Sequence, residues 1–270
     1  MRALQNLHQH TTYCDGKDTV EEVVLTAIAK GFTGIGFSGH SHTPYGDYAM
    51  TPESTKLYRQ EIAQMKEKYG DQIDIFCGLE YDRCSPVRPE GFDYVIGSVH
   101  GLELENAGFE YDGSLSHLEN IIQTYFGGDG MAFAKEYYRQ LMWLPDYADC
   151  DILGHFDLIT KHQENKVFFD CESKEYRYAA IEAVEALAGK IPYFEVNTGG
   201  IARGYRSTPY PDPFIIKEMK RLGFGAVITS DCHRRADMDC QYEEASALLQ
   251  SCGFTHSYIL TKDGFVPVPL

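Results

Sequence analysis

Residues 33–40 read TGIGFSGH, a short apolar run that stops at a histidine. The same pattern recurs along the chain, where short β-branched or apolar runs end in a histidine, a carboxylate or an asparagine and longer amphipathic stretches separate them. Such alternation is typical of repeated β-α units around a mostly parallel sheet, so we predict an α/β fold. The expected strands are 3–8 (ALQNLH), 33–40, 73–80 (IDIFCGLE), 93–100 (DYVIGSVH), 150–157 (CDILGHFD), 192–197 (PYFEVN) and 224–231 (FGAVITSD).

The stretches between these runs predict helices, several of them introduced by a polar cap or an early proline. A chain of 270 residues, 43% of them hydrophobic, can bury a substantial core. Chains of roughly 200 to 250 residues commonly form one α/β barrel domain, so we expect a single domain over 1–270. Within it, the long aromatic stretch 101–130 is expected to be an insert that covers the mouth of the barrel, although a solvated loop would have the same composition. The expected helices are 18–30, 53–69, 131–148, 174–188, 213–222 and 240–252.

The overall charge and the cysteines indicate the class of partner and the compartment. A net charge of −16 repels phosphate backbones and anionic lipids, so we expect no nucleic-acid partner. The eight cysteines are scattered, without a C-x-x-C pair or a secretory signal, which favours reduced thiols in the cytoplasm. No apolar run approaches the ~18 residues that cross a bilayer, so we expect no membrane association. The sequence carries no indication of the oligomeric state.

The histidines gather at the expected strand ends. Seven of the ten lie within three residues of such an end (8, 10, 40, 42, 100, 155 and 233). In a barrel of parallel strands these ends converge on one mouth, so imidazoles and carboxylates should meet there. Together they are ligands for Zn, Mn or Fe, and eight or nine candidates indicate two or three divalent metal ions. A site of that kind is suited to the hydrolysis of phosphate esters.

The motifs HQH, GHSH, GLE, GSVHG, GHFD and SDCH, in this order between residues 8 and 233, resemble the polymerase and histidinol phosphatase (PHP) superfamily. The resemblance implies a distorted (β/α)7 TIM-like barrel with a trinuclear metal site at the C-terminal mouth of the strands. It assigns one metal to His8, His10, Glu80 and Asp231, a second to Glu80, His100 and His155, and a third to Asp15, His40 and His233.

The size of the chain and the stretches GSVHG, GHFDL and EVNTGGIARG are most similar to the stand-alone members that hydrolyse histidinol phosphate. This resemblance implies a metal-dependent phosphatase that converts L-histidinol phosphate and water into L-histidinol and phosphate, in histidine biosynthesis, by attack of a metal-bridged hydroxide. The alternatives are a phosphodiesterase or nucleotidase, or a phosphotyrosine-protein phosphatase, with the same metal centre. A metal-buffering domain without catalysis is disfavoured because every motif position is filled.

Four further residues are expected at the mouth. His42 follows His40 by two positions and, in extended chain, points to the same side, where it would protonate the leaving alkoxide or contact the phosphate. The alternative is a loop histidine that only positions the segment SHTP (41–44). Asp157 stands two past His155, where it would assist proton transfer, hold a substrate ammonium group or merely cap the turn at residue 158. Arg203 and Arg206 follow a glycine-rich turn and are expected to bind the substrate phosphate, although Arg206 is equally consistent with a solvated loop charge.

Residues 34–39 (GIGFSG) satisfy the dinucleotide-binding pattern G-x-G-x-x-G. That pattern requires a preceding strand and a helix that opens directly after it. Here the glycines lie inside a strand run and Pro44 follows at the place where the helix should begin. We therefore expect no dinucleotide at this motif.

Overall fold

The computed structural model describes residues 4–105 and 107–270; Ala3 of the first expected strand and Asn106 of the expected insert lie outside the described residues. Seven strands form one sheet in which every neighbouring pair is parallel. The α/β prediction is therefore confirmed. The strands, in spatial order, are β1 (Gln5–Asn6), β2 (Gly34–Phe37), β3 (Asp74–Asp82), β4 (Tyr94–Ser98), β7 (Ile152–Leu153), β8 (Tyr193–Asn197) and β9 (Gly225–Thr229).

The sheet curls into a nearly closed barrel because the chain that follows β9 meets the chain that follows β1. The amide of His10 donates to the carbonyl of Cys232 at 3.0 Å, and the amide of Cys232 donates to the carbonyl of His8 at 3.2 Å. The side chain of Asn6 donates to Ser230 beside them at 2.9 Å. With seven strands, of which β1 and β7 have two residues each, the barrel is distorted, as the family resemblance implied.

Helices cover the outside of the barrel at the six expected places, with one break. The expected helix 131–148 is two helices, because α4 ends at Leu141 and α5 begins at Leu144. Among the residues that the structure describes, no helix has the length and apolarity needed to cross a bilayer. The helices are α1 (Val20–Ala29), α2 (Pro52–Tyr69), α3 (Leu115–Phe126), α4 (Gly130–Leu141), α5 (Leu144–Tyr147), α6 (Lys174–Leu187), α7 (Gly199–Ala202), α8 (Pro213–Arg221) and α9 (Tyr242–Ser251), with 3₁₀ turns η1 (Leu158–Thr160) and η2 (Arg235–Asp237).

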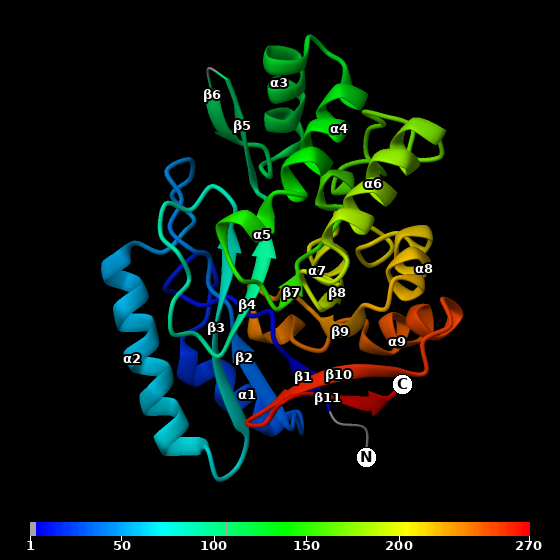
Figure 1. The fold of residues 1–270 in the computed structure, drawn as a ribbon. Helices are drawn as coiled ribbons and strands as arrows, with labels where there is room; N and C mark the ends of the chain where they lie inside the picture. The colour runs from blue at the N-terminus through cyan, green and yellow to red at the C-terminus, as the bar shows by residue number, and fades with distance from the viewer. Residues whose placement is uncertain (1–3, 106) are drawn as a thin grey trace.

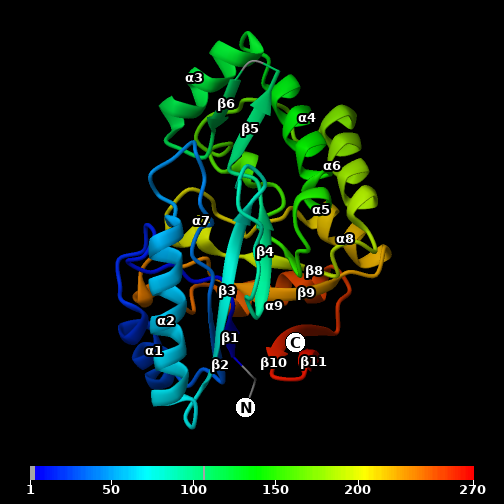
Figure 2. The same ribbon diagram turned by 60° about the vertical axis from the view of Figure 1, so that its left-hand side comes forward.

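The two ends of the barrel carry different additions. At the carboxyl end, the stretch 101–130 forms an antiparallel hairpin of β5 (Gly101–Leu104) and β6 (Ala107–Glu110) followed by α3, at the top of Figure 1. At the opposite end lies the hairpin of β10 (His256–Thr261) and β11 (Gly264–Pro269), and Figure 2 shows the same separation. The sequence did not predict either hairpin. That residues 1–270 form a single domain stays a prediction.

A tyrosine inside the barrel explains one glycine of the GIGFSG stretch, Gly36, and another in β3, Gly78. The hydroxyl of Tyr94 donates to the carbonyl of Leu7, and its ring lies against β2 and β3. A Cβ at Gly36 would lie 2.4 Å from the Tyr94 hydroxyl, and one at Gly78 would lie 2.3 Å from its ring. Both positions therefore need glycine to make room for a buried ring, which accounts for the glycine in the strand without any nucleotide.

Candidate metal centre

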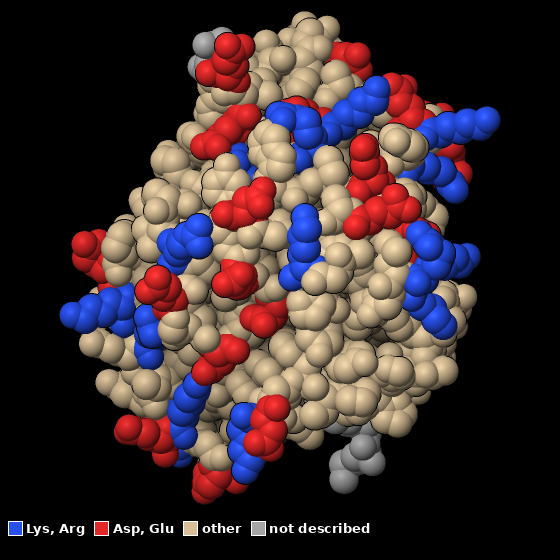
Figure 3. All heavy atoms as spheres, in the orientation of Figure 1, with Lys and Arg blue, Asp and Glu red and all other residues tan. Residues whose placement is uncertain are grey.

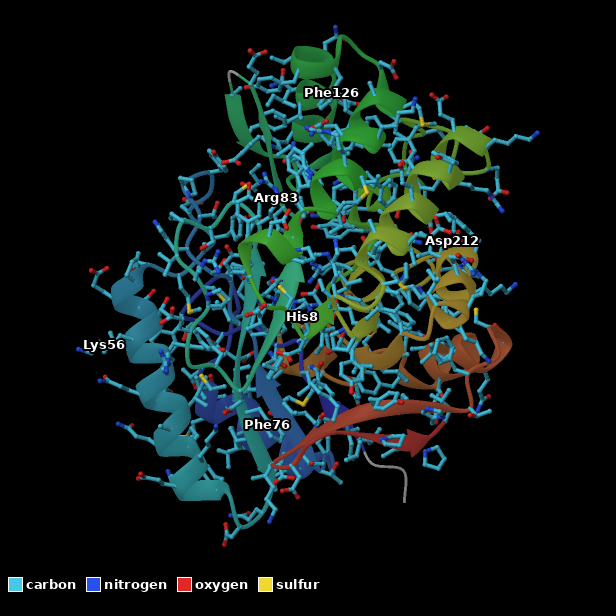
Figure 4. All side chains as sticks on the ribbon, viewed as in Figure 1. His8, Lys56, Phe76, Arg83, Phe126 and Asp212 are labelled. Carbon is cyan, nitrogen blue, oxygen red and sulfur yellow. The ribbon has the colours of Figure 1, made fainter. Side chains whose placement is uncertain are left out.

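The ends of six strands deliver side chains to one cavity of about 180 Å³. Asp15 lies in the loop after β1, His40 follows β2, Glu80 lies in β3, and the residues after β4, β7 and β9 complete the lining. His8 and His10, which follow β1, are buried beside the cavity against Glu80 and Asp231. Figure 4 places His8 between Phe76, toward the β10–β11 end, and Arg83, below the β5–β6 hairpin. The cavity is lined by Asp15, His40, Tyr48, Glu80, His100, Glu110, Asp112, His155, Leu158, Lys161, Arg203, Tyr205, Asp231 and His233.

The ligand set expected for the first metal has tetrahedral spacing. The Nε2 atom of His8 lies 3.3 Å from Glu80 Oε2 and 3.7 Å from Asp231 Oδ1. The Nε2 atom of His10 lies 3.6 Å and 3.2 Å from the same two oxygens. Four ligands at 2.0–2.1 Å from a tetrahedral zinc would stand about 3.4 Å apart. Three of these atoms, the two Nε2 atoms and Glu80 Oε2, are buried without a hydrogen-bond partner, as a metal site would leave them.

The second set shares Glu80 through its other oxygen. Glu80 Oε1 lies 3.2 Å from His100 Nε2 and 2.8 Å from His155 Nε2, and the two imidazole nitrogens are 3.3 Å apart. A carboxylate whose two oxygens face two separate ligand groups is placed to bridge two metal ions.

The third set surrounds Asp15, which reaches the cavity from the loop after β1. Asp15 Oδ1 lies 3.6 Å from His40 Nε2, and Asp15 Oδ2 lies 3.0 Å from His233 Nε2. His40 also contacts the other two sets, because its Nδ1 atom lies 2.8 Å from Glu80 Oε2. The structure thus brings all nine expected ligands together, while the assignment of each to a particular ion stays a prediction.

The charges of the cluster suit cations. Burial and the neighbouring His233 and His40 lower the pKa of His10 to about 3, so that its ring is neutral. Burial opposes ionisation of Glu80, but the charges of His40 and His8 hold the pKa of its carboxyl well below the usual value. Although burial opposes protonation, the neighbouring carboxylates raise the pKa of His8 and of His40, and a bound cation would take the place of the protons on these rings. Imidazoles that have released their protons and ionised carboxylates are the donors that Zn, Mn and Fe accept, so the residues present fit a polynuclear metal centre.

Two carboxylates that the sequence analysis missed stand behind the ligands. Glu195 on β8 accepts from His8 Nδ1 at 2.8 Å and from the amide of His155 at 2.7 Å. Asp82 accepts from the amide of His100 at 2.8 Å and lies 3.1 Å from its Nδ1. Strand alternation could have found both, since Asp82 follows Glu80 by two residues and an acidic residue inside the apolar run 192–197 must face the barrel interior.

Arg203 is one of the two cations that line the cavity in the part of the chain that the structure describes; the other is Lys161. Its guanidinium donates to Asp231 Oδ2 at 2.9 Å and to the Asp231 carbonyl at 2.8 Å. It also lies 2.9 Å from His233 Nδ1. The expectation that Arg203 lies at the mouth therefore agrees with its position, and its contact with substrate stays a prediction.

The other three expected mouth residues do not line this cavity. His42 lines a separate pocket with residues of α2 and the chain after β3, because β2 ends at Phe37 and the two-residue alternation does not extend through the loop after His40. Arg206 is buried instead, with its guanidinium stacked on Tyr210 at 4.3 Å and 3.8 Å from Asp157. The expectations for His42 and Arg206 at the mouth were wrong.

Asp157 is also turned away from the cavity, because it lies in a turn after β7 where alternation fails. It makes no side-chain capping hydrogen bond to the 3₁₀ turn that follows, so the capping alternative was wrong as well. Its Oδ2 accepts from the amide of Asp212 at 3.0 Å. Asp157 thus joins the N-terminus of α8 to the turn that follows β7.

Comparison with known proteins agrees with this geometry. The family model described as "PHP domain" matches residues 6–199. Over 94% of this chain and 87% of its own length, a Schizosaccharomyces pombe protein named "Probable histidinol-phosphatase" is 26% identical. The histidinol-phosphatase of Bacillus subtilis is also 26% identical, over 91% of this chain and 98% of its own.

A solved structure has the same fold. The histidinol phosphate phosphatase of Lactococcus lactis, crystallised with zinc, L-histidinol and phosphate, superposes with a TM-score of 0.68. The match covers 97% of this chain and 98% of the other at 22% identity. At that identity the likeness is one of fold.

Proposed function

The chain belongs to the PHP domain family, and from this premise we propose that it is a metal-dependent phosphatase that hydrolyses L-histidinol phosphate to L-histidinol and phosphate. The observation that carries the proposal is the nine-ligand cluster, which lies beside one cavity and contains several buried atoms without hydrogen-bond partners. The names of the similar proteins from Schizosaccharomyces pombe and Bacillus subtilis support the substrate. The zinc, L-histidinol and phosphate in the Lactococcus lactis structure are consistent with both the reaction and the metal.

In this proposal the nine ligands bind the metal ions and Arg203 binds the substrate. We assign two or three divalent ions to the nine ligands, with Glu80 as the bridge. Bound there, the ions would supply an activated water and neutralise the phosphate charge. Arg203 donates three hydrogen bonds to Asp231 and also lines the cavity, so we assign it the contact with a phosphate oxygen.

Size and charge favour a small phosphomonoester over the alternative substrates. A cavity of about 180 Å³, bordered by the β5–β6 insert, suits a single small leaving group. On the face shown in Figure 3, the basic side chains are interleaved with acidic ones, and the chain carries a net charge of −16. A long polynucleotide would require a basic track instead. We propose the cytoplasm as the compartment, which the eight free cysteines support.

The experiment is phosphate release from L-histidinol phosphate by protein loaded with manganese or zinc. We expect a kcat/KM of about 10⁴ M⁻¹s⁻¹ or more, lost on chelation and restored when metal is added back. The Glu80→Gln variant, which removes the bridging charge with little change of shape, is the inactive control. A metal-replete wild-type protein that releases no phosphate from this substrate, but does so from nucleotides or phosphopeptides, would overturn the proposed substrate.

A further inference from the structure

The wall of the cavity that faces the metal cluster carries charges that metal binding does not use. Once the nine proposed ligands are set aside, the charged lining residues are Arg203, Lys161, Asp112 and Glu110. Arg203 and Lys161 are positive, while Asp112 and Glu110 come from the β5–β6 insert and are negative. The cavity therefore has two carboxylates beyond those that its metal ions would neutralise.

Among the described residues, one of these two carboxylates has a cationic partner and the other has none. Lys161 Nζ lies 2.8 Å from Asp112 Oδ1, and both side chains are largely buried. Although burial opposes ionisation of Asp112, the charge of Lys161 holds its pKa below the usual value. Glu110, by contrast, forms no ion pair within 4.0 Å with any lysine, arginine or histidine in the ranges 4–105 and 107–270.

Glu110 is in an environment that would favour a bound cation. Burial and the negative charge of nearby Asp112 raise the pKa of Glu110. A cation placed beside it would offset both effects, because it would replace lost hydration and screen the repulsion between the two carboxylates.

The backbone fixes Glu110 close to the metal ligands. It is the last residue of β6 and pairs with Gly101, the residue directly after His100. The next amide, that of Tyr111, donates to the carbonyl of His100 at 3.0 Å, and the Tyr111 hydroxyl donates to Val99 at 2.6 Å. On the outer side, His117 Nε2 lies 2.9 Å from the Glu110 carbonyl. Glu110 is therefore held in place relative to the strand that carries a metal ligand.

We propose that Glu110 is the subsite for the ammonium group of the substrate, and that it selects phosphate esters of amino alcohols over uncharged phosphomonoesters. The inference rests on the proposed phosphatase function and deepens it. The phosphate faces the metal ligands and Arg203, and the leaving group then extends toward the insert, where the ammonium donates to the Glu110 carboxylate. Charge complementarity at this point provides specificity rather than chemistry.

The test compares two small esters of similar size, O-phosphoethanolamine and propyl phosphate, beside L-histidinol phosphate. We expect the wild-type protein to prefer O-phosphoethanolamine to propyl phosphate, and Glu110→Gln to lower kcat/KM for both amino esters by about tenfold or more, mainly through KM. For propyl phosphate the change should stay below about twofold. Glu105→Gln, which removes a charge from an exposed position of the same hairpin, is the matched control. It should leave kcat/KM for the amino esters and for propyl phosphate unchanged.

The outcomes separate the inference from the proposed function. If L-histidinol phosphate is not a substrate but the wild-type preference for O-phosphoethanolamine is present and disappears in Glu110→Gln, the proposed substrate fails and the ammonium subsite holds. If the wild-type protein shows no preference for the charged ester, or if Glu110→Gln slows all three esters equally, the subsite is refuted. The metal content of each variant, measured in parallel, shows whether a change arises from loss of the metal centre.

Discussion

Replacement of Glu195 by glutamine should weaken metal binding although Glu195 is not among the nine ligands. Its Oε2 accepts from His8 Nδ1 and from the Thr229 hydroxyl, both at 2.8 Å, and its Oε1 accepts from the amide of His155 at 2.7 Å. His8 can bind a metal through Nε2 only if its proton is on Nδ1, and the Glu195 carboxylate stabilises that tautomer.

The structure sets the size of the effect. In Glu195→Gln the Oε1 contacts with His155 and Asn197 can persist, but an NH₂ group then faces His8 Nδ1 at the distance of a hydrogen bond. The favourable arrangement becomes Nδ1 as acceptor with the proton on Nε2, which blocks the metal-binding atom. Loss of such a partner typically weakens metal binding by about 10- to 100-fold, which corresponds to roughly 1.4–2.7 kcal/mol.

The assay is zinc affinity and stoichiometry, measured by competition with a chromophoric chelator. Thr229→Val is the matched control, because it removes one hydrogen bond to the same Glu195 oxygen and leaves both the carboxylate and the His8 tautomer unchanged; we expect less than a threefold effect. The reasoning is refuted if Glu195→Gln binds zinc with wild-type affinity, or if Thr229→Val weakens binding equally.

Four other predictions concern the centre and its surroundings. Glu80→Ala and Asp231→Ala should each lose bound metal and activity together, measured by elemental analysis beside phosphate release; a metal-replete, active variant would contradict the ligand sets. Arg203→Ala should lower kcat by about a hundredfold, because it removes the cation assigned to the phosphate, and unchanged steady-state constants would exclude that role. Arg206→Met should lower the free energy of unfolding by about 3 kcal/mol in denaturant titrations, because it leaves Asp157 buried without its partner, while the metal content of the folded protein stays constant. Zinc added to the chelated protein at 100 times its dissociation constant should raise the free energy of unfolding by about 2.7 kcal/mol per independent site, seen as a higher melting temperature in calorimetry.

The sequence predicted what depends on parallel strands and their ends. Each apolar run that stops at a histidine or carboxylate contains a strand of the barrel, so eight of the nine ligands could be placed from the strand ends before the fold was known; Asp15 was assigned only through the family resemblance. His8 and Glu80 illustrate the reason. All strands point the same way, so the residue that ends one strand lies near the residue that ends its neighbour, whatever connects them.

The incorrect placements arose where the chain leaves the strands. His42 and Asp157 were placed by two-residue alternation, which holds only while the backbone stays extended, and the structure has a loop at the first and a turn at the second. Arg206 was placed, like Arg203, by the glycine-rich turn after the sixth strand, yet the two guanidinium groups contact different carboxylates, Asp157 and Asp231. The two-residue alternation of side chains does hold for Asp82 in β3 and Glu195 in β8, two residues for which the sequence analysis did not use it. A charged side chain inside an apolar strand can find hydrogen-bond partners only in the barrel interior, because the outer face of the strand is covered by apolar side chains. The sequence therefore predicts its position better than that of a charged side chain in a loop, which can also face solvent.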